Sequence, residues 1–443
     1  MKKIIFIVLF LVAAMAQAQQ SSNRLFLGTK TLYIPLALHY AAAPKDYKAV
    51  FINYLGRHGS RHLTKDVSAY YLFSIINKAD SLNLLTAKGQ QLKNRILLLD
   101  KVEMGKTKFI SYEGKTELQQ IASRLYANNK NVFKNGANIN LRYTKEQRTL
   151  QSADAFMQSL KQKTTIQLLQ QNEDNENLRF YDLSDAYTNY KKKGKWTDSL
   201  AKLKKNIHYQ QLAHTICTRF FNKTFLEDNK IDEEKIASDI FGFATIAYSL
   251  QNEIAEAGAT FKDIDFTALL LPHEMQCLQQ LDNAEEYFTK GPATNINGTQ
   301  VKIAVPLLID FIRTTNDFIQ TQNTNIQLRF CHAETVIPFA AIMNIASAST
   351  AAKNIQEIGL VWRAENIAPL SGNIQWILYY NSITKNYIIK FLLNEKEVAV
   401  NGLKTKTFPY YEWNDVKEFY TNKLHLLNAD VNTNTLEYLQ SLK

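Results

Sequence analysis

The 443-residue sequence predicts an α/β fold, in which a central, mostly parallel sheet is flanked by helices and a mainly α-helical domain is inserted into the chain. Near both ends, short runs of β-branched and aromatic residues alternate with segments of helical periodicity, as in βα units. The middle of the chain is rich in Lys, Glu, Gln, Ala and Leu and has few strand signals. With 46% hydrophobic residues, the chain has enough apolar material for one large or two ordinary domains.

Residues 1–18 have the pattern of a signal peptide. Lys2 and Lys3 precede an apolar run, and Ala16-Gln17-Ala18 is the small-x-small pattern that a signal peptidase accepts. We expect cleavage after Ala18 and export to the periplasm, to outer-membrane vesicles or to the medium. Loss of the two lysines lowers the formal net charge of +11 by two, so the mature chain stays basic. No later apolar run approaches the roughly 18 residues that span a bilayer, so we expect no stable membrane insertion.

The first part of the α/β domain is expected over residues 19–180. Short β-branched or aromatic runs predict strands at 49–55 and 138–143. Helical periodicity predicts three helices in this part, at 68–77, 115–128 and 150–160. Each predicted strand is thus followed by helical sequence, which is the organisation of a βα unit.

The inserted helical domain is expected over residues 181–295, and the second part of the α/β domain over 296–443. In this second part, strand character returns at 325–331, 373–380 and 386–393. A short polar turn separates the last two runs, so we expect them to form a β-hairpin.

A cluster of positive charge follows the first predicted strand, in the sequence RHGSR at residues 57–61. From charge alone, a solvated basic loop explains it. However, open α/β sheets bind ligands at the carboxyl ends of their strands. Arg57 and Arg61 offer planar forks of donors suited to phosphate, and Gly59 lets the backbone approach a ligand. His58 can attack phosphorus through one ring nitrogen if a hydrogen bond to a carbonyl keeps the other nitrogen protonated.

The sequence RFCHAE at residues 329–334 follows another predicted strand and supplies an acid. Cleavage of a phosphate ester requires a proton for the departing alkoxide. Glu334 can donate this proton and later deprotonate water, provided that its carboxyl is protonated at the working pH. A His-Ala-Glu triplet is a weak signal alone, but together with RHGSR it predicts phosphoryl transfer.

Five segments together resemble branch 2 of the histidine phosphatase superfamily, and specifically the multiple inositol polyphosphate phosphatases (phytases). Besides RHGSR and HAE, these are LGTKTLY at 27–33, SYEGKTELQQIASRL at 111–125 and TKEQRTLQSADAFMQSL at 144–160. The resemblance covers both ends of the mature chain, whereas the helical middle has no matching motif. It implies the histidine acid phosphatase-like form of the predicted fold.

The resemblance also implies a role for each matching residue. His58 would form a phosphohistidine, and Glu334 would be the proton donor and then the general base. The transferring phosphoryl group would be bound by Arg57, Arg61, Arg148 and His332. Lys30, in the TKT element, is a candidate for contacting a non-reacting phosphate, and a structural or solvated lysine explains it equally well. No metal ion or other cofactor is implied, because cationic side chains stabilise the charge that develops.

One position departs from the family pattern. The family motif commonly has a proline two residues after its second arginine, whereas this chain has Leu63 there, preceded by His62. The departure leaves the rigidity of the loop and the role of His62 open.

Other polar residues receive simpler interpretations. His273, Glu274 and Cys277 could form half of a metal site, but no second ligand cluster supports one, so we interpret them as helix-surface residues. Four isolated histidines are interpreted as satisfied or exposed: His39, His208, His214 and His425.

The resemblance and the charge together predict the substrate. The resemblance implies myo-inositol hexakisphosphate (phytate) together with lower inositol polyphosphates, and a basic exported protein attracts a dense polyanion. Two alternatives stay open: a broad-specificity histidine acid phosphatase that acts on small phosphomonoesters, and a non-catalytic phosphate-binding protein. Nucleic acid is not expected as a partner, because the basic residues are spread along the chain and no recognition motif is present. The oligomeric state and the order of phosphate removal stay open.

Overall fold

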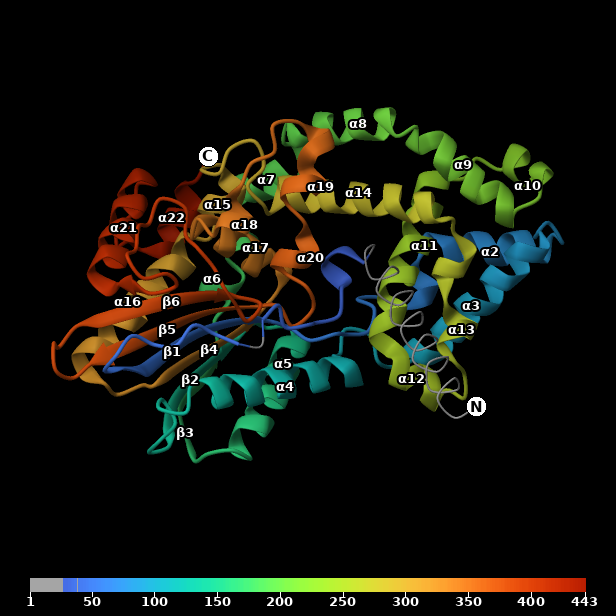
Figure 1. Cartoon of the computed structure of the whole chain (residues 1–443). Coiled ribbons are helices and arrows are strands. Elements are labelled where there is room, and N and C mark those ends of the chain that lie inside the picture. Colours follow the sequence, from blue (N-terminus) through green and yellow to red (C-terminus); the bar gives the residue numbers. More distant parts are fainter. Residues whose placement is uncertain (1–26, 38) are drawn as a thin grey trace, which may run out of the picture.

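A mixed sheet runs through the α/β part of the molecule (Figure 1). The computed structural model describes residues 27–37 and 39–443, so the predicted signal peptide lies outside the described residues. The strand order is β3-β2-β4-β1-β5-β6-β7, and β8 pairs with β6. The strands are β1 (Tyr47–Arg57), β2 (Ala137–Tyr143), β3 (Ile166–Glu173), β4 (Ile326–Cys331), β5 (Asn373–Asn381), β6 (Tyr387–Leu393), β7 (Lys396–Glu397) and β8 (Tyr411–Glu412).

The sheet divides into a parallel and an antiparallel half. Neighbouring strands from β3 through β2 and β4 to β1 are parallel. The pairs on the other side of β1, which join β5, β6, β7 and β8, are antiparallel. The predicted α/β fold class is confirmed, but the sheet is mixed rather than mostly parallel. The reason lies in the predicted hairpin, since a short turn such as that between β5 and β6 can join only antiparallel neighbours.

Strand β1 lies between the two halves and is covered on both faces. From Phe51 to its end at Arg57, every residue is buried. On one face the Phe51 ring stacks on Phe318 with ring centroids 4.8 Å apart, and on the other face Tyr54 packs against Phe156 at 5.0 Å. A strand buried on both faces reads as a continuous apolar run, which is why this segment was recognisable in the sequence.

Two layers of helices cover the sheet (Figure 1). The helices α4 (Tyr112–Asn128) and α5 (Gln147–Lys161) share a core with one face of the sheet. The helices α16 (Val305–Thr321), α17 (Ala333–Ile342) and α21 (Trp413–Leu426) contribute to the core on the other face. Shorter helices connect these elements: α6 (Asn175–Leu178), α15 (Thr299–Lys302), α18 (Ala346–Ser349), α19 (Ile358–Val361), α20 (Ala364–Ile367), α22 (Thr435–Ser441), and the 3-10 turns η2 (Gly28–Lys30) and η4 (Phe180–Asp182).

A helical region packs beside the sheet and is built from two stretches of the chain (Figure 1). Helix α11 contacts α2, α9 and α14, and α3 contacts α9. The backbone N–H of Leu72 in α2 donates to Asp239 of α11 at 3.1 Å. The predicted insertion at 181–295 is therefore joined by α2 and α3, which the sequence analysis placed in the α/β part, and its boundaries stay a prediction. Its helices are α2 (Tyr71–Ser81), α3 (Ala87–Glu103), α7 (Asp185–Lys193), α8 (Trp196–Asn206), α9 (Tyr209–Phe220), α10 (Lys223–Asp228), α11 (Glu233–Ala247), α12 (Gln251–Glu256), α13 (Phe261–Ile264) and α14 (Pro272–Thr289).

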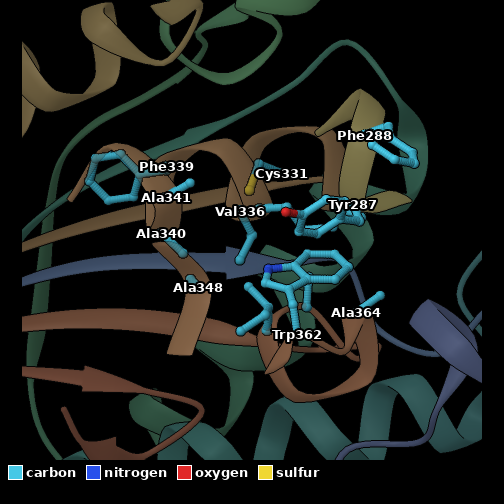
Figure 2. Close-up of a cluster of buried hydrophobic side chains, with 14 of the residues drawn as sticks. Tyr287, Phe288, Cys331, Val336, Phe339, Ala340, Ala341, Ala348, Trp362 and Ala364 are labelled. Atoms are coloured by element: carbon cyan, nitrogen blue, oxygen red, sulfur yellow. The ribbon is translucent and has the colours of Figure 1, made fainter. Parts of the chain in front are cut away.

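Helix α14 connects this helical region to the sheet layer through an apolar cluster (Figure 2). Tyr287, near the end of α14, packs edge-on against Trp362 with ring centroids 5.6 Å apart. The cluster also contains Cys331 at the end of β4 and Val336 of α17. The end of α14 is thus held against the start of α17.

The described residues contain no helix that combines the length and apolarity needed to cross a membrane.

Candidate active site

Three neighbouring parallel strands, β1, β4 and β2, end at one edge of the sheet. Arg57 pairs with Cys331 across β1 and β4, and Tyr143 pairs with Phe330 across β2 and β4. The segments that follow these strands are RHGSR, HAE and TKEQR. This register brings together His58, His332 and the start of α5, where Arg148 lies.

His58 is buried at this edge with its ring held in one orientation. Its side chain is 3% exposed, and Nδ1 lies 3.0 Å from the carbonyl oxygen of Gly59. Because a carbonyl only accepts hydrogen bonds, Nδ1 carries the proton and Nε2 keeps its lone pair in the neutral ring. Burial lowers the pKa of His58 well below its ordinary value, and the charges of Arg57 and Arg148 lower it further. The ring is therefore neutral and has the form that a nucleophile requires.

The loop around His58 is fixed by α4. Glu117 accepts hydrogen bonds from the backbone and the hydroxyl of Ser60, at 3.1 and 2.8 Å, and from the hydroxyl of Ser371 at 2.7 Å. A Cβ on Gly59 would lie 2.7 Å from the carbonyl oxygen of Gly114, and a Cβ on Gly114 would lie 2.1 Å from that of Ser60. In this structure Gly59 therefore serves backbone-to-backbone packing against α4, which differs from the ligand approach inferred from the sequence.

Arg57, Arg61 and Arg148 surround His58 and keep part of their donor capacity unused. Nη1 of Arg57 donates to the carbonyl of Ala368 at 2.8 Å and to that of Thr29. Nη1 of Arg61 donates to the carbonyl of His62 at 2.7 Å. Nε of all three arginines is buried without a hydrogen-bond partner among the described residues. Burial, followed by the other two guanidinium groups, lowers the pKa of Arg61 to about 10, so it stays cationic at neutral pH.

His332 lies beside His58 and contacts Arg148. Its ring centroid is 5.4 Å from that of His58. Nη2 of Arg148 lies 3.3 Å from Nδ1 of His332, and the hydroxyl of Thr144 lies 2.9 Å from Nε2. Burial lowers the pKa of His332 well below its ordinary value, and Arg148 lowers it further. His332 is therefore also neutral.

Glu334 lies in the first turn of α17, where the helix dipole favours a carboxylate. Its side chain is 34% exposed, and Oε1 lies 3.4 Å from Nζ of Lys290. Burial raises the pKa of Glu334, but the ammonium group of Lys290 outweighs burial, so the pKa lies well below its ordinary value. Without a bound anion the carboxylate form is favoured, whereas the acid step expected from the sequence needs a proton. A phosphate dianion beside Glu334 would raise its pKa, because like charges disfavour ionisation.

A pocket of about 540 Å³ opens beside these residues. Arg148, His332 and Glu334 reach it from the edge of the sheet, and Tyr181 and Tyr187 form part of its wall. Four further cations line it: Lys145, Arg179, Lys191 and Lys192. Sequence reasoning assigned neither Arg179 nor the lysines of α7 to the site. Lys30 is partly exposed on η2 and does not line this pocket, so its contact with substrate stays a prediction.

His62 and Leu63 have structural partners. Nδ1 of His62 lies 3.2 Å from Glu103 and Nε2 lies 3.7 Å from Glu253, so the ring joins the active-site loop to α3 and α12. The backbone N–H of Leu63 donates to Glu103 at 3.1 Å. A proline at this position would lack that N–H. In this chain the hydrogen bond to Glu103 restrains the loop in place of a proline ring.

The remaining polar residues lie away from the pocket. His39, His208, His214 and His425 are exposed, as predicted. Glu274 is buried and paired with Arg219 at 2.7 Å, so its interpretation as a helix-surface residue was wrong. Its carboxylate also accepts from the N–H of Leu271, which places it at the start of α14 as a cap. Within residues 27–37 and 39–443, no group of three or more His, Cys, Asp or Glu residues is placed to hold a metal ion.

Comparison with known proteins identifies a family. The family model described as histidine phosphatase superfamily (branch 2) matches residues 50–394. Among solved structures, the chain is similar to Bifidobacterium longum multiple inositol polyphosphate phosphatase in complex with inositol hexasulfate, with a TM-score of 0.79, 19% identity, and coverage of 90% of this chain and 97% of that chain. It is also similar to the phytase from D. castellii, with a TM-score of 0.65, 13% identity, and coverage of 94% and 87% of the two chains. A comparison with curated proteins gives no match.

The region matched by the family model begins before RHGSR and ends beyond HAE, so it includes both motifs and the inserted helices. The structural neighbours share less than a fifth of their residues with this chain, so they add the fold alone. The resemblance to branch 2 that the sequence motifs indicated is confirmed. The chain belongs to branch 2 of the histidine phosphatase superfamily, and it is a histidine-type phosphomonoesterase.

Proposed function

We propose that this protein hydrolyses the phosphomonoesters of phytate and of lower inositol polyphosphates. The observation that carries the proposal is the charge of the pocket. Beyond the arginines around His58, the wall adds Lys145, Arg179, Lys191 and Lys192. Glu146 and Asp182 line the same pocket and pair with Arg148 and Arg179, but the three lysines form no ion pair with any described residue, so the wall carries more positive charge than one phosphoryl group needs. A substrate with several phosphates can use all of these cations, whereas a small monoester can use only those near His58. The B. longum neighbour, solved in complex with inositol hexasulfate, supports the same substrate class.

In the proposed first step, Nε2 of His58 attacks phosphorus while the proton on Nδ1 stays bonded to the carbonyl of Gly59. The P–Nε2 bond forms, the P–O bond to the inositol breaks, and the departing oxygen takes a proton from Glu334. The buried donors of Arg57, Arg61 and Arg148 stabilise the phosphoryl oxygens.

In the second step, water attacks phosphorus and the P–Nε2 bond breaks. The Glu334 carboxylate takes the proton from this water, so orthophosphate leaves and neutral His58 is restored. Cationic side chains supply all the charge stabilisation, and the proposed mechanism is metal-independent.

The test of the mechanism is phosphate release from phytate by the wild type and by His58→Ala, both with chelator present. We expect the variant to lose activity and the wild type to keep it. His214→Ala is the matched control, because His214 is exposed and lies on α9 outside the pocket. Full activity of His58→Ala would refute the nucleophile, and loss of wild-type activity on adding chelator would refute the metal-free mechanism.

The test of the substrate class compares kcat/KM for phytate with that for a small phosphomonoester. Replacement of both Lys191 and Lys192 by Met should lower the value for phytate and leave the value for the monoester nearly unchanged. An equal effect on both substrates would favour a broad-specificity acid phosphatase. Binding of phytate with no phosphate release would indicate a non-catalytic phosphate-binding protein.

The proposal includes export, which rests on residues 1–18 alone. Expression of the full chain in a bacterium with a Sec pathway should yield a mature protein in the periplasm, in vesicles or in the medium. Its amino-terminal residue should be Gln19. A cytoplasmic product that still begins at Met1 would contradict export.

A further inference from the structure

A buried ion pair lies behind Glu334. Nζ of Lys290 is 2.6 and 2.8 Å from the two carboxylate oxygens of Glu286 and 3.4 Å from Oε1 of Glu334. The side chains of Lys290 and Glu286 are 10% and 14% exposed, whereas that of Glu334 is 34% exposed. Glu334 lines the pocket, whereas Lys290 is more deeply buried and contacts the carboxylate from the protein interior.

The end of α14 holds Lys290 in this position. The hydroxyl groups of Tyr187 and Tyr190 donate to the carbonyls of Thr289 and Phe288, at 3.0 and 2.7 Å. Figure 2 shows Tyr287 and Phe288 on the last turn of the helix, with Tyr287 against Trp362. The carbonyl end of a helix also favours a cation. Lys290 is therefore placed by packed elements and not by a flexible loop.

We propose that Lys290 is a positioning residue of the phosphatase reaction, which orients the Glu334 carboxylate toward the pocket and favours its ionised form, while Glu286 holds Lys290 in place. This inference rests on the proposed function. A single carboxyl has to be protonated in the first step and ionised in the second. Lys290 favours the second of these states, and the charge of the bound substrate favours the first.

The balance depends on every charged or titratable group that faces Glu334. Lys290 is the largest favourable contact, and Glu286 offsets part of its charge. The groups that face Glu334 from the other packed elements are Arg57 at the end of β1 and Arg61 after it, Cys331 at the end of β4 and His332 after it, Tyr181 of η4 and Tyr187 of α7. Groups from both the helical region and the sheet therefore affect the protonation of Glu334.

The experiment measures the pH dependence of kcat/KM in the wild type and in variants of Lys290 and Glu286. The substrate is an alkyl phosphomonoester, whose poor leaving group needs a proton from Glu334. Lys290→Met should move the alkaline limb up by about one to two pH units, the usual effect of removing one opposite charge at this distance. Glu286→Gln should move it down, because Lys290 then acts on Glu334 alone. Lys290→Arg should restore the wild-type limb.

Lys290→Met alone leaves Glu286 buried without its partner and can prevent folding. The double variant Lys290→Met/Glu286→Gln removes both charges and should still show the upward shift. The matched control is Lys93→Met, which breaks an ion pair of 2.6 Å between α3 and α2 and should leave the limb in place. Equal limbs in the wild type and the double variant, or shifts of the same sign in both single variants, would overturn the proposal.

A measurement that needs no turnover separates this inference from the proposed function. In protein labelled with carbon-13 at the glutamate carboxyls, the Glu334 signal is the one lost in Glu334→Gln. It should titrate at higher pH in the double variant than in the wild type. A shift in titration without phosphatase activity in the wild type would support the role of Lys290 and refute the proposed function. Phosphatase activity without this shift would support the proposed function and refute the role of Lys290.

Discussion

Two groups of buried or half-buried arginines lie on or beside the central strands of the sheet and differ in their partners. The core arginines, Arg142 of β2 and Arg329 of β4, share Asp310 of α16, with contacts of 2.9 and 2.6 Å. Arg142 also pairs with Asp174 at 3.0 Å, and Nη1 of Arg329 donates to Asn53 at 2.7 Å. The core arginines therefore have carboxylates that offset their charge.

The site arginines, Arg57, Arg61 and Arg148, have fewer such partners. Arg148 pairs with Glu146 at 2.8 Å, whereas Arg57 and Arg61 donate to backbone carbonyls and form no ion pair with any described residue. Their Nε atoms are buried and unpaired within the described part of the chain. The comparison teaches that a buried guanidinium without a carboxylate is a place for an anion, because the cost of burying it is offset only when the anion binds.

The largest effect is expected in the core group. Arg329→Met should lower the free energy of unfolding by about 3–5 kcal/mol, because it removes a fully buried guanidinium and leaves the nearly buried Asp310 with Arg142 alone. Urea unfolding measures this value. Arg61→Met is the matched comparison, and an equal loss of stability in both variants would contradict the distinction between the groups.

The next effect is catalytic. Arg61→Met should lower kcat/KM for phytate by about 10²–10³, which is typical for the loss of one donor to a developing charge. Its stability should change little, because Arg61 makes a single side-chain hydrogen bond, to the carbonyl of His62, among the described residues. A variant that unfolds under assay conditions, or one with wild-type kcat/KM, would show that Arg61 belongs with the core arginines.

Inorganic phosphate should distinguish the groups without catalysis. At a concentration 100 times its Kd, phosphate should stabilise the wild type by about 2.7 kcal/mol. Thermal unfolding with and without phosphate should show the shift in Arg329→Met and a smaller shift in Arg61→Met. If phosphate stabilised Arg61→Met but not Arg329→Met, the core arginines and not the site arginines would bind the anion.

Burial determines which strands could be predicted from the sequence. Strands β1, β4, β5 and β6 were recognisable because they are almost fully buried runs. Strand β3 was missed because it is an edge strand whose residues are nearly all exposed, so IQLLQQNE carries no burial pattern. RHGSR and HAE were found because each follows such a buried strand directly.

The outer parts of the site were not predictable in this way. Arg179 comes from the connection between β3 and the helical region, Lys191 and Lys192 come from α7, and Lys290 follows the last residue of α14. Their place depends on how α7 and α14 pack, which local periodicity does not contain. The lysines of α7 therefore could not be assigned to the site from the sequence.

The smallest effect concerns His62, which joins the loop of the site arginines to two carboxylates. Burial lowers the pKa of His62, but its hydrogen bonds with Glu103 and Glu253 outweigh burial, so the pKa is raised above its ordinary value. The contribution of His62 to stability is then fully present below its pKa in the unfolded chain and is lost as the pH rises through its pKa in the folded protein. His62→Asn should therefore lower the free energy of unfolding more at pH 5 than at pH 8, as measured by urea unfolding. His425→Asn, on the exposed surface of α21, should show no such difference. A loss that is equal at both pH values would mean that His62 acts through packing alone, and one that is larger at pH 8 would show that the folded protein prefers the neutral ring.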